Sequence, residues 1–250
     1  MNDQSFRVIA LDGGAASGKS STSRGVAERM HLLYVNSGEF YRVITYHLLE
    51  EDVHSKSEEE IEAALAKVSL ESKIENGGVV PVLNGKAVPT NELRSPNVNA
   101  NVSLYAAKRP VRNFLTDPLR DLVETGKAEG YQGLIMEGRD IGTVIFPDAD
   151  FKFFLSASEE TREQRRQSEG QMDLVVQRDL LDSKRSAAPF VPADRSIRIN
   201  TDELDLQEVI DLVGGIILTG KVPGAATIDP FRGNTKDEDG WDASEGSQSS

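Results

Sequence analysis

The sequence predicts a three-layer α/β fold, in which helices cover both faces of a parallel five-stranded core sheet. Short apolar segments alternate with longer amphipathic segments along most of the chain, which is typical of parallel strands joined by helices. The first apolar segment, FRVIAL at residues 6–11, also runs directly into a glycine-rich loop and a helical stretch. The length of 250 residues fits one compact domain with small insertions.

The individual elements follow from these patterns. The predicted strands span residues 6–11, 32–35, 133–136, 151–155 and 196–199. The predicted helices span residues 19–30, 37–50, 57–67, 98–125, 159–167, 173–181 and 206–218. Within the longest of these helices, Pro110 and Pro118 predict breaks, because proline lacks the backbone N–H that a helix interior needs.

A small antiparallel insertion interrupts the parallel pattern. Residues 70–83 alternate in polarity around Asn76-Gly77, and a second Asn-Gly pair follows at Asn84-Gly85. Asn-Gly between alternating segments is a strong hairpin signal, so a meander is expected over residues 70–88. The C-terminal residues 223–250 are acidic and rich in Gly and Ser, which predicts a disordered tail.

Composition excludes several classes of function. The chain has no cysteine, which excludes disulfides and thiolate metal sites and favours the cytoplasm. A formal net charge of -13 argues against non-specific nucleic-acid binding, and no apolar run approaches the ~20 residues of a membrane span. Arginines nevertheless cluster between residues 139 and 198, which suits a small anionic ligand.

The glycine-rich loop is the first candidate site. Residues 13–20 fit G-x-x-x-x-G-K-[ST], the Walker A pattern, whose backbone N–H groups surround phosphate oxygens. Lys19 is expected to reach the β- and γ-phosphates, and Ser20 or the adjacent Ser21 to serve Mg²⁺. The predicted ATP-binding residues of the loop are Gly13, Gly14, Ala15, Ala16, Ser17, Gly18, Lys19, Ser20 and Ser21. The loop alone indicates a nucleoside triphosphate, because GTPases, ATPases and small kinases share it.

Three further segments place polar residues at element ends. Ser37 can cap the second helix, and Arg42 one turn later, taken by itself, is better interpreted as an ordinary solvated arginine. The Gly-Arg-Asp within residues 137–143 follows a predicted strand, where open α/β sheets bind ligands. Arg178 and Asp182 share a helix face, and by themselves they indicate only an i,i+4 salt bridge.

Taken together, these segments resemble the bacterial cytidylate kinase family. The resemblance rests on DGGAASGKSS, NSGEFYR, ELRSPNVNANVS, VRNFL, EGRDIGTVIFPDA and RDLLDSKRSAAPFVPA, in family order over most of residues 6–213. It implies a P-loop nucleoside monophosphate kinase domain over residues 1–222. Within that domain it implies an acceptor-binding insertion at about 37–112 and a helical lid at about 158–190.

The resemblance also implies roles for single residues. The CMP pocket would be lined by Ser37, Arg42, Ser103, Arg112, Arg139, Asp140, Arg178, Asp182 and Arg185. Of these, Ser103, Arg112 and Asp140 would face cytosine, and Asp182 would lie near the ribose. Lys19, Arg139, Arg178 and Arg185 would be the catalytic charges, and Arg162, Arg165 and Arg166 are candidates for the ATP side.

The implied activity is transfer of the γ-phosphate of ATP, with Mg²⁺, to CMP or dCMP in pyrimidine metabolism. The family resemblance also favours a monomer. Two alternatives stay open: a P-loop kinase for another small acceptor such as UMP, AMP or shikimate, and a non-catalytic nucleotide-binding module. A GTPase should carry an Asn-Lys-x-Asp motif, which the sequence lacks.

Overall fold

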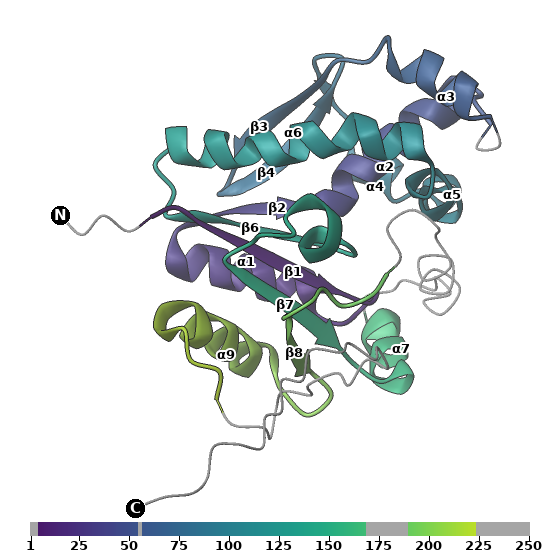
Figure 1. Cartoon of the computed structure of the whole chain (residues 1–250). Helices are drawn as coiled ribbons and strands as arrows, with labels where there is room; N and C mark the ends of the chain where they lie inside the picture. Colours follow the sequence, from purple (N-terminus) through teal and green to yellow (C-terminus); the bar gives the residue numbers. More distant parts are fainter. Residues whose placement is uncertain (1–4, 55–56, 169–189, 224–250) are drawn as a thin grey trace, which may run out of the picture.

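The computed structural model describes residues 5–54, 57–168 and 190–223 (Figure 1). The helix predicted over residues 173–181 lies outside these ranges, as do Arg178, Asp182 and Arg185, nearly all of the predicted tail and most of the predicted lid. Within the described part of the chain, no helix is both long enough and apolar enough to cross a membrane.

A parallel sheet forms the centre of the molecule. Its strands are β1 (Arg7–Gly13), β2 (Leu32–Asn36), β6 (Gly133–Gly138), β7 (Phe151–Ser156) and β8 (Ile197–Asn200). They pair in the order β2-β6-β1-β7-β8, and every neighbouring pair is parallel. All five strands correspond to segments predicted from apolar runs, with ends that differ by one or two residues.

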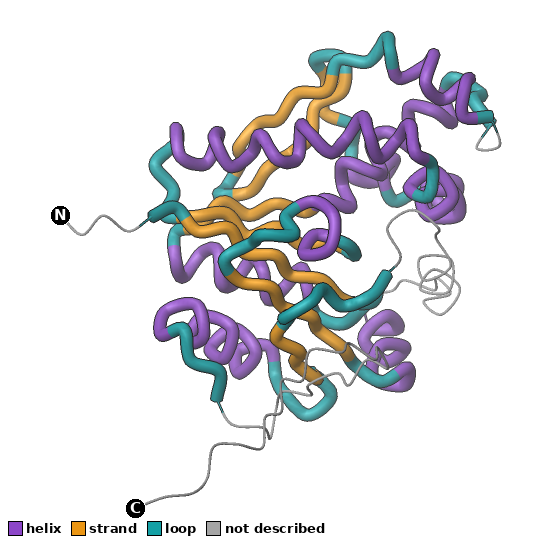
Figure 2. Tube along the Cα trace, in the orientation of Figure 1, coloured by secondary structure: helices purple, strands orange, loops and turns teal. Residues whose placement is uncertain are grey.

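Helices cover both faces of this sheet (Figures 1 and 2). They are α1 (Lys19–Met30), α2 (Ser37–Glu50), α3 (Glu58–Leu65), α4 (Thr90–Leu93), α5 (Pro96–Ala106), α6 (Arg109–Ala128), α7 (Glu159–Ser168) and α9 (Leu206–Thr219). Side chains that alternate along a strand enter opposite cores. Ile9 and Leu11 join the core beneath α1 and α9, whereas Ala10 joins the core beneath α2 and α6. The predicted three layers are therefore confirmed.

One predicted helix break is wrong. Helix α6 runs without interruption from Arg109 to Ala128 and contains Pro118 in its interior. Leu115, Leu119 and Leu122 on one face of this helix are almost fully buried. Their burial contributes about 1.5–3 kcal/mol per side chain, enough to offset the ~3 kcal/mol cost of an interior proline. Pro110 does mark a boundary, because it lies in the first turn of α6.

The antiparallel meander is present as predicted. It consists of β3 (Leu70–Glu75), β4 (Gly78–Leu83) and β5 (Lys86–Ala87), and Asn-Gly pairs with positive φ make both turns. The meander does not stand apart from the core. Strand β4 pairs in parallel with β2 through Tyr34 and Gly78, so the sheet continues to β3.

Candidate functional site

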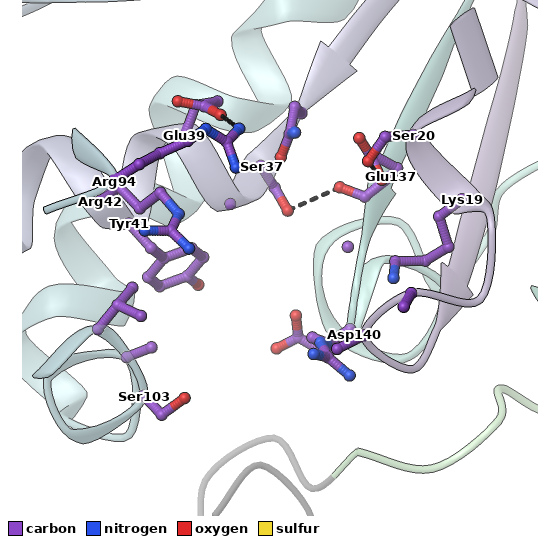
Figure 3. Close-up of a pocket in the computed structure, with 18 of the residues that line it drawn as sticks. Lys19, Ser20, Ser37, Glu39, Tyr41, Arg42, Arg94, Ser103, Glu137 and Asp140 are labelled. Atoms are coloured by element: carbon purple, nitrogen blue, oxygen red, sulfur yellow. Dashed lines mark hydrogen bonds and ion pairs between the residues drawn. The ribbon is translucent and has the colours of Figure 1, made fainter. Parts of the chain in front are cut away.

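A cleft opens at the carboxyl ends of β1, β2 and β6, where ligands of open α/β sheets bind (Figure 3). Lys19 and Ser20 lie on one side of it, and Tyr41, Arg42 and Ser103 lie on the other. The full lining is Ala15, Ala16, Lys19, Ser20, Asn36, Ser37, Gly38, Glu39, Tyr41, Arg42, Arg94, Val102, Ser103, Ala106, Glu137, Gly138, Arg139, Asp140 and Arg166.

The glycine-rich loop at residues 13–20 has the geometry of a phosphate-binding backbone loop, called the phosphate nest below. A side chain at Gly13 would bring its Cβ within 2.3 Å of the Leu155 carbonyl oxygen, so the loop can turn there only with glycine. Gly18 has φ 90° and precedes α1 without a side-chain cap, which leaves the first N–H groups of that helix for an anion. The Lys19 ammonium donates to the Gly14 carbonyl at 2.6 Å and so lies across the loop.

The two serines after Lys19 lie in different surroundings. Both are exposed, but the Ser20 hydroxyl lines the cleft and donates to Glu137 Oε2 at 2.9 Å, whereas Ser21 is outside the lining. The Tyr34 hydroxyl donates to Glu137 Oε1 at 2.5 Å. Burial, together with the Glu137 carboxylate, raises the pKa of Tyr34, so this phenol stays a donor. Of the two hydroxyls, the geometry favours Ser20 as the Mg²⁺ ligand.

A buried ion pair joins Arg112 to Asp140. Asp140 lines the cleft, whereas Arg112, which was also expected to line the pocket, is not among the lining residues. The Arg112 guanidinium contacts the Asp140 carboxylate directly and donates to the Ala106 carbonyl at 2.8 Å. Both side chains are buried, with Arg112 7% and Asp140 3% exposed. A buried charge needs such partners, because leaving it unpaired costs several kcal/mol. Ser103 lines the cleft on α5, the helix that precedes Arg112.

Ser37 does not cap the second helix. The N-cap residue of α2 is Asn36, and the Ser37 hydroxyl donates to the Glu137 carbonyl at 2.8 Å. The capping interpretation is therefore wrong, because α2 begins one residue earlier than capping by Ser37 would need, and Ser37 is already its first helical residue. This bond ties the start of α2 to the strand that carries Arg139 and Asp140.

Arg42 is not a solvated surface arginine. It is buried, and its guanidinium donates to the Leu93 carbonyl at 2.8 Å and to Asn99 Oδ1 at 2.7 Å. Beside it, Arg94 pairs with Glu39 at 2.5 Å. Arg42 thus adds positive charge to the α2 side of the cleft, whereas Glu39 balances the charge of Arg94. Arg139 lines the cleft from the end of β6, with its guanidinium 5.0 Å from the Phe190 ring.

The three arginines of α7 differ in where they lie relative to the cleft. Arg166 is buried and lines the cleft. Arg165 donates to the Thr201 hydroxyl at 2.9 Å and to the Thr201 carbonyl at 2.7 Å, and so links α7 to the end of β8. Arg162 is not among the lining residues. The geometry favours Arg166 as the ATP-side candidate.

Two carboxylates at this site were missed by sequence reasoning. Glu137 links Ser20 and Tyr34, as described above. Asp12 accepts from the N–H groups of Ile141 at 2.9 Å and Gly142 at 2.8 Å. Burial raises the pKa of Asp12 to about 6, against the opposing effect of those two bonds. Each carboxylate ends a buried strand, which was the signal available in the sequence.

One cleft therefore contains both a phosphate nest and Asp140, the carboxylate of a buried ion pair. Such an arrangement can hold a nucleoside triphosphate and a second, smaller anionic ligand at once. Lys19 and Arg139 both line this cleft and bring positive charge to it.

Comparisons with known proteins agree with this geometry. A family model described as cytidylate kinase matches residues 9–218. A cytidylate kinase of Bacillus anthracis is 35% identical over 221 residues, covering 84% of this chain and 95% of the relative. A bifunctional pantoate ligase/cytidylate kinase of Prochlorococcus marinus is 34% identical, covering 82% of this chain and 42% of that protein.

Solved structures are more distant. TT1252 from Thermus thermophilus has 14% identity and a TM-score of 0.41, covering 86% of this chain and 97% of that chain. A sugar kinase from Janibacter sp. HTCC2649 has 16% identity and a TM-score of 0.39, covering 83% of this chain and 91% of that chain. The extent of the family match and the identity to curated relatives are decisive, and the chain belongs to the cytidylate kinase family.

Proposed function

We propose that this chain transfers the γ-phosphate of ATP to CMP or dCMP, producing ADP and CDP or dCDP. One observation carries the proposal: Lys19 of the phosphate nest and Asp140, which Arg112 holds in a buried ion pair, line a single cleft. The nest accounts for a donor triphosphate, and Asp140 accounts for a base in the same cleft. The curated relatives in Bacillus are themselves named cytidylate kinases.

The chemistry requires charge compensation rather than a general base. A nucleoside monophosphate has a second phosphate pKa near ~6, so it is already a nucleophilic dianion at neutral pH. The obstacle is repulsion between two polyanions and the charge spread over the transferred group. Lys19, Arg42 and Arg139 line the cleft and supply cations of fixed position. Arginine suits this role, because its planar fork binds phosphate oxygens in pairs and stays charged.

Selection of the base rests on Asp140. Cytosine carries an amino donor where uracil carries a carbonyl oxygen, so a carboxylate accepts from the first and repels the second. Arg112 holds that carboxylate through their ion pair. Ser103 adds a hydroxyl that can donate or accept within the same cleft.

The residues present also fit Mg²⁺. A hard cation takes oxygen ligands, and the Ser20 hydroxyl and the Glu137 carboxylate lie together beside the phosphate nest. We propose that these two groups hold the ion, directly or through water. When bound, Mg²⁺ would neutralise charge on the β- and γ-phosphates of ATP.

The lid and the catalytic role of its charges are part of the same proposal. Arg166 on α7 lines the cleft, so the described first part of the predicted lid contributes to the site. We propose that residues 158–190 close over the nucleotides and exclude water from the γ-phosphate. Arg178 and Arg185 would then add phosphate contacts, and Asp182 a ribose contact. We also expect a cytoplasmic monomer that acts on small molecules alone.

A coupled assay of ADP release across CMP, dCMP, UMP, AMP and shikimate tests the proposal. We expect fast release with CMP and dCMP, slower release with UMP, and little without an acceptor. Preference for another acceptor would support a different small-molecule kinase. Binding of ATP without acceptor-dependent turnover would support a non-catalytic module. Either result would contradict the proposed function.

A further inference from the structure

The residue that we assign to base selection sits immediately before an unusual element. Asp140 is the N-cap of η1, a five-residue π-helix at Ile141–Ile145. Its internal hydrogen bonds include Phe146 N–H to the Ile141 carbonyl at 2.7 Å. Single π-turns are rare, and they occur frequently at functional sites. So short an element leaves backbone groups at both ends that need outside partners.

Asp12 supplies the partner at the first end. One carboxylate oxygen accepts from Ile141 N–H at 2.9 Å, and the other accepts from Gly142 N–H at 2.8 Å. Asp12 is 2% exposed and comes from β1, the strand that leads into the phosphate nest. A negative group at the start of a helical turn also complements the backbone dipole there.

Arg120 supplies the partner at the second end. Its Nε donates to the Ile145 carbonyl at 2.9 Å, and a terminal nitrogen donates to the Val144 carbonyl at 3.0 Å. Arg120 comes from the middle of α6, two turns after Arg112. Helix α6 therefore holds the loop at two points, at Asp140 through Arg112 and at the end of η1 through Arg120.

Neither Asp12 nor Arg120 belongs to the described lining of the cleft. Their partners are backbone groups, so they cannot contact an acceptor in this arrangement. They control instead the backbone of η1, the segment that directly follows Asp140. Asp140 lies between β6 and η1, so the direction of its buried carboxylate depends on how both elements are held.

We propose that Asp12 and Arg120 are positioning residues for acceptor choice, which hold the two ends of η1 and thereby fix Asp140 toward the base. This inference rests on the proposed CMP kinase function. It assigns base selectivity partly to residues outside the binding cleft. It also links the strand of the phosphate nest to the residue that reads the acceptor.

The test is the ratio of kcat/KM for CMP to kcat/KM for UMP in variants of the full chain. Arg120 is exposed, so Arg120→Gln should fold. We expect it to lower the ratio by about two- to tenfold, the rate equivalent of losing about one net hydrogen bond, with an unchanged KM for ATP. Arg120→Lys should recover part of the ratio, because one ammonium can still donate to a carbonyl.

The matched control is Lys127→Gln, which removes an exposed ion pair with Glu124 on the same helix and should leave the ratio unchanged. Asp12→Asn provides a second variant. We expect it to lower the CMP-to-UMP ratio further, because the amide nitrogen of asparagine would face one of the backbone N–H groups and cannot accept from it. A native ratio in Arg120→Gln, whatever happens to its melting temperature, would overturn the proposal. Failure of the wild type to phosphorylate CMP is a separate outcome, seen before any variant is made, and it would overturn the proposed function as well.

Discussion

Replacing Asp140 by asparagine tests how the acceptor is chosen. The substitution keeps the size of the side chain but removes the negative charge that pairs with Arg112. Asp140 and Arg112 are 3% and 7% exposed, so the lost interaction lies in a desolvated site. A hydrogen bond to a charged group contributes about 1.5–3 kcal/mol. At about 1.36 kcal/mol per factor of ten, the preference for CMP over UMP should fall roughly 10- to 150-fold.

Most of this change should come from CMP. Asparagine can turn its amide nitrogen toward the carbonyl oxygen of uracil, so kcat/KM for UMP should stay level or rise. The coupled ADP-release assay, run at saturating ATP and Mg²⁺ with each acceptor varied, gives both values. An unchanged ratio in a folded variant would refute the assignment of Asp140 as the reader of the base.

The same variant should also be less stable. Arg112 keeps its bond to the Ala106 carbonyl but loses its counter-charge. Breaking a buried pair costs about 3–5 kcal/mol, and we expect the lower end because asparagine still offers an acceptor. Urea unfolding measures this change. The control is Arg29→Gln, which breaks a surface pair with Asp211 and should cost at most about 1 kcal/mol.

Three further predictions concern the donor side and its supporting carboxylates. Lys19→Ala should remove most ADP release while thermal unfolding stays close to that of the wild type, and near-normal turnover would contradict the role of the phosphate nest. Glu137→Gln should weaken Mg²⁺-dependent binding of a non-hydrolysable ATP analogue, measured by calorimetry with and without the ion, whereas equal loss under both conditions would speak against the metal role. Because burial raises the pKa of Asp12 to about 6, its carboxyl stabilises the fold most when protonated, and this contribution is lost as pH rises from about 4 through about 6. Asp12→Asn cannot titrate at this position. Between about pH 4 and pH 7 the free energy of unfolding of the wild type should therefore fall by roughly 2–3 kcal/mol relative to that of the variant, and parallel pH profiles would contradict the raised pKa.

Local chemistry explains why much of the fold is predictable. Apolar runs and the change of period predict the strands of the core and the meander, and both Asn-Gly pairs adopt the positive φ that such turns require. Gly13 and Gly18 follow the same logic within the phosphate nest. In each case the information lies within a few residues, because the conformation depends on backbone preferences and on the spacing of apolar side chains.

The family resemblance also predicted which positions gather at the cleft. Ser37, Arg42, Ser103 and the Arg139-Asp140 pair line it together. Their motif resemblance predicted this grouping, although it said nothing of their hydrogen bonds. The expected contacts of Arg178, Asp182 and Arg185 stay predictions, since these residues lie outside the described part of the chain.

The sequence alone thus predicts a parallel α/β core, a phosphate nest and a cytosine pocket, whereas the partners of individual polar groups depend on the tertiary structure. Ser37 looked like a helix cap, but its acceptor is the carbonyl of Glu137, 100 residues away. Pro118 looked like a helix break, but burial along α6 outweighs its cost. Glu137 and Asp12 begin two of the motifs, but no role was predicted for either, and their partners come from segments more than 100 residues distant. Such contacts arise only when strands and helices pack, because a buried polar group takes whichever partner the surrounding elements bring within reach.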